Sequence, residues 1–116
     1  MGGLTRLAAM ALSILLEAPV AAGLVAVQGA RPPAWVAAAL AAGAGTALTH
    51  PFVWHGALAL YPRVGVPLTL VVVESAAILA EAWIYARFAG VPPRRALAIS
   101  AAANGFSASV GAWLTW

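Results

Sequence analysis

Four long apolar stretches follow one another along the chain, and short segments containing glycine, proline or arginine separate them. An α-helix rises about 1.5 Å per residue, so it needs roughly 20 apolar residues to cross the ~30 Å hydrocarbon core of a bilayer. Stretches of that length occupy residues 4–28, 34–61, 66–88 and 94–116. The pattern predicts an all-α integral membrane protein with four transmembrane helices in a single domain, residues 1–116.

The connections between these stretches are short. Residues 29–33, 61–65 and 89–93 each contain glycine and proline, which commonly form turns and end helices. Short connections place consecutive helices antiparallel to each other. We therefore expect a four-helix transmembrane bundle with both termini on the same side of the membrane.

Composition supports a membrane location and excludes several classes of function. Hydrophobic residues make up 64% of the chain and charged residues only 8%, which leaves too little polar surface to coat a soluble domain. The net charge of +3 comes from scattered arginines, so the chain has no surface suited to nucleic acid. The absence of cysteine excludes disulfides, thiolate metal sites and iron–sulfur clusters.

The arginines predict an orientation because positive residues are enriched in cytoplasmic loops. Four of the six lie on the side of the first and third connections: Arg31, Arg87, Arg94 and Arg95. Two, Arg6 and Arg63, lie on the side of the termini. This distribution predicts termini on the non-cytoplasmic side of the membrane, which we expect to be a bacterial-type inner membrane.

All three acidic residues, Glu17, Glu74 and Glu81, lie inside apolar stretches. An ionised side chain at the centre of a membrane helix costs at least about 2.5–3.5 kcal/mol on insertion scales. Residues that persist at such a cost commonly bind ions, carry protons or pair with one another. The glutamates are therefore the first candidates for a functional site.

The glutamates share a layer of the bilayer with polar residues from the other helices. Counted at about 1.5 Å per residue from the terminus side, the layer lies about 12–22 Å deep. Its members are Glu17, His50, Glu74, Glu81, Asn104 and Ser107. Thr46 lies one helical turn before His50 and shares its face. Four helices thus each contribute to one predicted polar site.

Two kinds of chemistry fit this set. Carboxylates and imidazole are suitable ligands for a divalent metal such as Zn²⁺, Mn²⁺ or Fe²⁺, which would be bound by Glu17, His50, Glu74 and Glu81. The same four side chains can instead carry protons, with Asn104, Ser107 and Thr46 in supporting roles. The identity of any cofactor stays open.

Some of the polar residues have a simpler interpretation. Serine and threonine in membrane helices often serve only as packing contacts, which applies to Ser13, Thr46, Thr49, Ser100 and Ser107. Pro19 and Pro51 each leave a backbone carbonyl without its helical partner, and such carbonyls can coordinate cations. Proline is also tolerated in membrane helices without any such role.

Three classes of function remain. The first is binding or transport of a cation, of protons or of a proton-coupled solute. The second is a structural or electron-transfer-associated subunit of a larger membrane complex, and the third is a metal-dependent enzyme acting on a lipophilic substrate within the membrane. The chain has no Walker loop and no HExxH motif. Because four short helices enclose little volume, we expect a homo-oligomer or a partner membrane subunit in each case.

Overall fold

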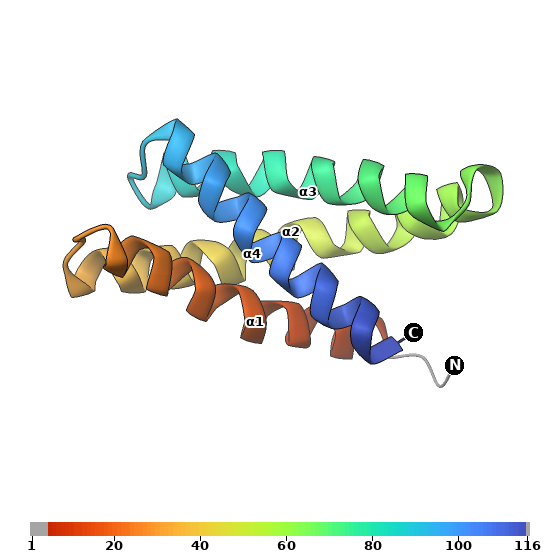
Figure 1. Ribbon diagram of the computed structural model, residues 1–116, viewed down its shortest axis with the longest axis horizontal. Coiled ribbons are helices and arrows are strands. Elements are labelled where there is room, and N and C mark those ends of the chain that lie inside the picture. Colours follow the sequence, from red (N-terminus) through yellow and green to blue (C-terminus); the bar gives the residue numbers. More distant parts are fainter. Residues whose placement is uncertain (1–4, 116) are drawn as a thin grey trace.

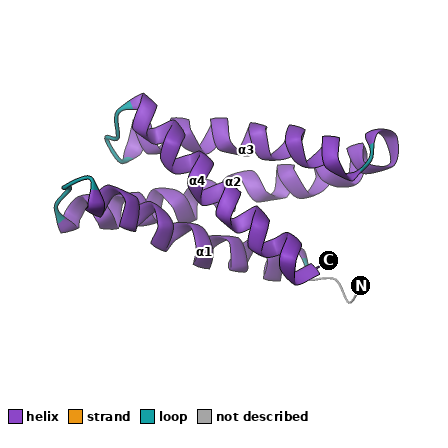
Figure 2. Ribbon diagram, in the orientation of Figure 1, coloured by secondary structure: helices purple, strands orange, loops and turns teal. Residues whose placement is uncertain are grey.

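The computed structural model describes residues 5–115, which form four helices joined by short loops (Figure 2). The helices are α1 (Arg6–Val27), α2 (Pro32–Val64), α3 (Val66–Phe88) and α4 (Pro93–Thr115). Each is long and apolar enough to cross a membrane. The predicted all-α, four-span architecture is therefore confirmed. Leu4, which begins the predicted first span, and Trp116, which ends the predicted fourth span, lie outside the described residues.

The helices pack in a ring in which each contacts the next and α4 returns to α1. Figure 1 shows α4 crossing the bundle obliquely, and it shows the start of α1 and the end of α4 at the same end of the molecule. The bundle measures 44 × 24 × 19 Å, so its long axis exceeds the ~30 Å hydrocarbon core. The predicted four-helix bundle with short loops is confirmed. All four helices contribute side chains to its interior.

The second helix extends further than the sequence predicts. A turn was expected over 61–65, but α2 continues through Pro62 to Val64, and only Gly65 separates it from α3. Gly65 makes this sharp reversal at a φ of 81°, which side chains rarely allow. Pro62 lies inside this helix and leaves the Leu58 carbonyl without its helical donor, a defect that membrane helices tolerate. At the neighbouring position, the Arg63 guanidinium donates a 2.6 Å hydrogen bond to the Ala59 carbonyl.

Proline also begins helices here instead of forming the expected turns. Pro32 opens α2 and Pro93 opens α4. The first helical position suits proline because its nitrogen needs no helical partner there, and its fixed φ already matches a helix. The first and third connections are consequently shorter than predicted from the proline positions.

Small side chains hold the helices together at the end of the bundle that carries the first and third loops. Ala21, Ala38, Ala42 and Ala96 are almost completely buried there, together with Ile99 and Tyr85. Alanine lets helix backbones approach closely, which is how membrane helices associate without a hydrophobic driving force. This tightly packed cluster closes one end of the bundle, whereas the polar residues lie toward the other end.

Candidate functional site

A cavity of about 390 Å³ lies inside the half of the bundle that carries the termini, and all four helices line it. Its wall includes every residue of the predicted site: Glu17, Thr46, His50, Glu74, Glu81, Asn104 and Ser107. The structure therefore brings these residues together as the depth argument requires. Their roles in binding or proton transfer stay predictions.

The innermost part of the cavity contains a three-residue contact across three helices. The Thr46 hydroxyl on α2 donates a short hydrogen bond to Oε2 of Glu17 on α1. The same hydroxyl oxygen lies 3.3 Å from Oε1 of Glu81 on α3. Glu17 and Glu81 are 3% and 2% exposed, so both carboxyl groups are removed from bulk solvent. Thr46 thus connects two buried carboxyl groups.

The number of protons available limits how this contact is made. A threonine hydroxyl has one proton to donate and accepts through its lone pairs, whereas an ionised carboxylate only accepts. Thr46 can therefore donate a full, unshared hydrogen bond to only one of Glu17 and Glu81. Both contacts are full hydrogen bonds when one of the two carboxyl groups is protonated and donates to the Thr46 oxygen. The geometry suits a pair of glutamates that holds one proton between them.

Glu81 makes further polar contacts on either side of Thr46. The Thr49 hydroxyl lies 3.3 Å from Oε2 of Glu81, and Asn104 on α4 also interacts with this carboxyl group. Asn104 is itself fixed by hydrogen bonds of its amide nitrogen to the backbone and side chain of Ser100, at 3.0 and 3.3 Å. On the other carboxyl group, Ser107 interacts with Glu17. The sequence indicated only a packing role for Thr49, and its spacing of three from Thr46 is the signal that links it to the site.

Close approach of α2 and α3 positions Glu81 against Thr46. A Cβ atom placed on Gly45 would lie 3.1 Å from Cγ of Glu81 and 3.5 Å from Cδ1 of Ile84. The glycine therefore leaves the space that the stem of the Glu81 side chain occupies. A further cross-helix contact comes from the buried Ser100 hydroxyl, which donates a 2.7 Å hydrogen bond to the Ile78 carbonyl. These contacts fix α3 between α2 and α4.

His50 and Glu74 occupy the part of the cavity nearer the termini. Both are only half-buried, unlike Glu17 and Glu81. The His50 ring lies 6.0 Å from the Trp54 ring, and its Nε2 atom is buried without a hydrogen-bond partner. His50 and Glu74 therefore line the same cavity as the innermost carboxyl pair but are less deeply buried.

The arrangement bears on the two chemistries predicted for the site. Within residues 5–115, no three histidine, aspartate or glutamate side chains are grouped so that they could hold a metal ion. The contacts described for Glu17 and Glu81 are with the hydroxyl groups of Thr46 and Thr49. Binding of a divalent metal by Glu17, His50, Glu74 and Glu81 stays a prediction without geometric support.

The helix-interior prolines lie away from the cavity. Pro19 and Pro51 leave the carbonyl groups of Leu15 and Ala47 without a helical donor. Leu15 is 71% exposed and Ala47 is also exposed, and neither lines the cavity. Coordination of a cation by these carbonyls therefore gains no support from the structure.

The chain matches no protein-family model, no curated protein and no solved structure. A functional interpretation of the cavity consequently depends on its own geometry. The relevant facts are the depth of the two carboxyl groups, the single hydroxyl between them and the four helices that enclose them.

Proposed function

We propose that this protein is a proton-coupled membrane transporter in which Glu17 and Glu81 share one proton and exchange it for a cation. The observation that carries the proposal is the position of Thr46, whose hydroxyl oxygen contacts both buried carboxyl groups. With one proton, the pair carries a single negative charge and all its contacts are satisfied. Without that proton, the two carboxylates repel each other in a medium of low dielectric constant.

Exchange follows from this balance of charge. A cation that enters the cavity stabilises the fully ionised pair and so favours release of the shared proton. When the cation leaves, the pair regains a proton because two unscreened carboxylates at this depth are costly. Proton and cation thus compete for one site, which is the basic requirement of an exchanger.

The shape of the bundle supports transport by alternating access. The cavity lies in the half of the molecule toward the termini, whereas the alanine-rich cluster around Tyr85 closes the other half. A transporter needs a state in which its site is accessible from one side only. The position of the cavity in one half of the bundle, with both carboxyl groups on its wall, supports this part of the proposal.

Proton flux in proteoliposomes tests the proposal. Purified protein is reconstituted with a pH-sensitive dye inside the vesicles, and gradients of monovalent and divalent cations are imposed in turn. We expect a cation gradient to drive proton movement in the wild type. Glu17→Gln and Glu81→Gln should reduce this flux to that of protein-free vesicles, because each removes one carboxyl group of the pair.

Two further variants make the result specific. Thr46→Ser keeps a hydroxyl at the bridging position and should retain flux that Thr46→Val loses. Ser109→Ala is the matched control, because the Ser109 hydroxyl is exposed and bonds only to the Gly105 carbonyl of its own helix. Equal flux in the wild type and in both glutamine variants would refute the proposal. The subunit and enzyme alternatives stay predictions.

A further inference from the structure

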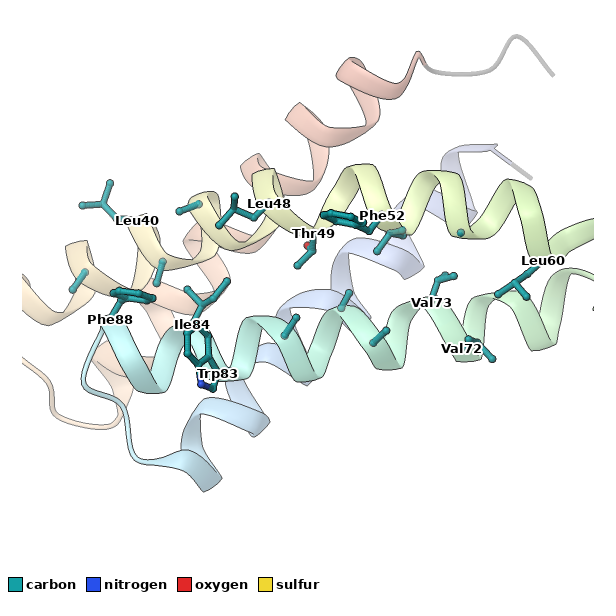
Figure 3. A pocket seen from close by; sticks show the side chains of 18 residues that line it. Leu40, Leu48, Thr49, Phe52, Leu60, Val72, Val73, Trp83, Ile84 and Phe88 are labelled. Atoms are coloured by element: carbon teal, nitrogen blue, oxygen red, sulfur yellow. The ribbon is translucent and has the colours of Figure 1, made fainter.

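A long apolar groove runs between α2 and α3 on the outside of the bundle (Figure 3). It has a volume of about 1220 Å³, and all its lining residues belong to these two helices. Figure 3 shows Leu40 and Phe88 toward one end of the groove and Leu60 and Val72 toward the other. Along α3 the lining extends from Val72 to Phe88, which corresponds to about 24 Å of helix. The groove therefore faces the hydrocarbon of the bilayer over most of its thickness.

The groove and the polar cavity share part of their walls. Thr49, Val53 and Ala77 line both spaces. Among the described residues that line the groove, Thr49 carries the only hydroxyl group, and that hydroxyl lies 3.3 Å from Oε2 of Glu81. A thin partition at mid-length thus separates an apolar surface open to lipid from a buried carboxyl group.

Charge decides what kind of molecule suits both spaces. Three glutamates line the cavity, and none of the described residues lining it is an arginine. An anionic head group would meet three carboxyl groups and no guanidinium on this wall, whereas a cationic one would be attracted to the carboxyl groups. The groove, in contrast, offers aliphatic and aromatic side chains to a hydrocarbon chain. They include Trp83 and Phe88, which pack edge to face with their ring centroids 5.9 Å apart.

We propose that the cation exchanged at the carboxyl pair is a lipophilic ammonium ion, whose hydrocarbon chain lies in the α2–α3 groove while its head passes Thr49 to reach Glu81. This inference rests on the proposed proton exchange and adds the substrate class and its route from the membrane. The step involves no covalent change in the ammonium ion. The proton leaves the Glu17–Glu81 pair for water in the cavity, and the positive charge of the ammonium group replaces it.

A quaternary ammonium series tests this inference because such cations have no proton of their own to release. Protein in nanodiscs of zwitterionic lipid is titrated with decyltrimethylammonium in weak buffer, with heat and a pH-sensitive dye as readouts. Empty nanodiscs give the contribution of the lipid. We expect release of about one proton per bound cation, since the pair holds one.

Two further probes separate the contribution of the charged head group to binding from that of the hydrocarbon chain. Tetramethylammonium carries the charge without the chain, and we expect it to bind about tenfold more weakly or worse. Decanol carries the chain without the charge and should release no proton. Equal affinity for tetramethylammonium and decyltrimethylammonium would overturn the inference, because the groove would then contribute nothing.

Variants locate the binding to the groove. Ala76→Phe and Ala44→Phe each place a ring in the groove from opposite helices, outside the cavity lining, and should weaken decyltrimethylammonium binding about tenfold. Ala102→Phe is the matched control on an exposed site of α4 that lines neither space. Wild-type affinity in both groove variants would overturn the inference. A change of oligomeric size in both would do so as well, because the groove would then be a contact between copies of this chain.

Failure of this inference is distinguishable from failure of the proposed function. If inorganic cations drive a proton flux that depends on Glu81 while decyltrimethylammonium neither binds nor releases protons, only the substrate class is wrong. If Glu81→Gln leaves proton release by decyltrimethylammonium unchanged, the route to the carboxyl pair is wrong. In the supporting case, release disappears in Glu81→Gln and Thr49→Val weakens binding of decyltrimethylammonium.

Discussion

The hydroxyl oxygen of Thr46 lies 3.3 Å from Oε1 of Glu81 while the same hydroxyl donates its proton to Glu17. Thr46 and Glu81 come from neighbouring helices that pack closely where Gly45 precedes Thr46. The contact therefore couples the packing of α2 and α3 to the protonation of a buried carboxyl pair. Changes in either should alter the other.

Replacement of Thr46 by valine removes the hydroxyl from both carboxyl groups at nearly constant volume. We expect the free energy of unfolding to fall by about 1.5–3 kcal/mol, because hydrogen bonds to charged groups contribute that much. Thr46→Ser should recover most of this loss. Equilibrium unfolding in mixed micelles of sodium dodecyl sulfate measures the difference. Equal stability of the valine and serine variants would show that the hydroxyl contributes nothing.

Alanine at Gly45 should disturb the site through packing alone. Its methyl group would lie 3.1 Å from Cγ of Glu81, so the side chain or the helix has to move. Overpacking of this kind costs about 1–3 kcal/mol, and we expect proton flux to fall with the free energy of unfolding. Gly105→Ala is the control, since no atom lies within 4 Å of its added Cβ. That variant should gain about 0.5–1 kcal/mol from higher helix propensity. The packing argument fails if Gly45→Ala behaves like this control.

The Tyr85 hydroxyl is buried without a hydrogen-bond partner, and the residue is 1% exposed. Removal of an unpartnered polar group from a packed core relieves a desolvation cost. Tyr85→Phe should therefore be at least as stable as the wild type, with a gain of up to about 1 kcal/mol. Tyr61→Phe, at a 55% exposed site, should leave stability unchanged. A clear loss of stability in Tyr85→Phe would mean that its hydroxyl has a partner in the folded protein.

The orientation proposed from the arginines is testable because the chain contains no cysteine. Single cysteines at Gln28 in the first connection and Val64 before the second lie at opposite ends of the bundle, and both positions are exposed. In intact cells, a membrane-impermeant maleimide should label the Val64→Cys variant and not the Gln28→Cys variant. The reverse pattern would place the termini in the cytoplasm.

Much of the architecture could be predicted from the sequence because length and hydropathy determine which segments cross a membrane. The predicted third span, 66–88, coincides with α3. The end of α2 was wrong because proline was taken as a helix breaker at position 62. Proline is tolerated inside membrane helices, and Gly65 with its positive φ is the residue that ends the helix.

The site was predictable to the level of a shared layer, and no further. Depth along a helix follows from residue number, and the structure has Glu17, His50, Glu81 and Asn104 on the wall of one cavity. Which side chains touch depends on helix rotation and crossing angle, which an alanine-rich sequence specifies weakly. The bridging role of Thr46 and the contact of Thr49 with Glu81 therefore emerged only from the packed helices.

The α2–α3 groove was not predicted for a related reason. Its alanine, leucine and valine residues have the composition expected of any lipid-facing surface. A groove arises only from how two helices diverge and from the contrast between alanines and larger side chains such as Phe52 and Trp83. Such features depend on pairs of helices, whereas sequence patterns describe one helix at a time.

Infrared spectroscopy of the carboxyl groups tests the shared proton most directly. Protein labelled with ¹³C-glutamate is compared with the double variant Glu17→Gln, Glu81→Gln at neutral pH, in H₂O and in D₂O. We expect the wild type to show the carbonyl stretch of a protonated glutamic acid, shifted by D₂O. The band should weaken in the double variant, in which Glu74 is the remaining glutamate. Absence of a protonated glutamic acid in the wild type, or an undiminished band in the double variant, would contradict a proton shared between Glu17 and Glu81.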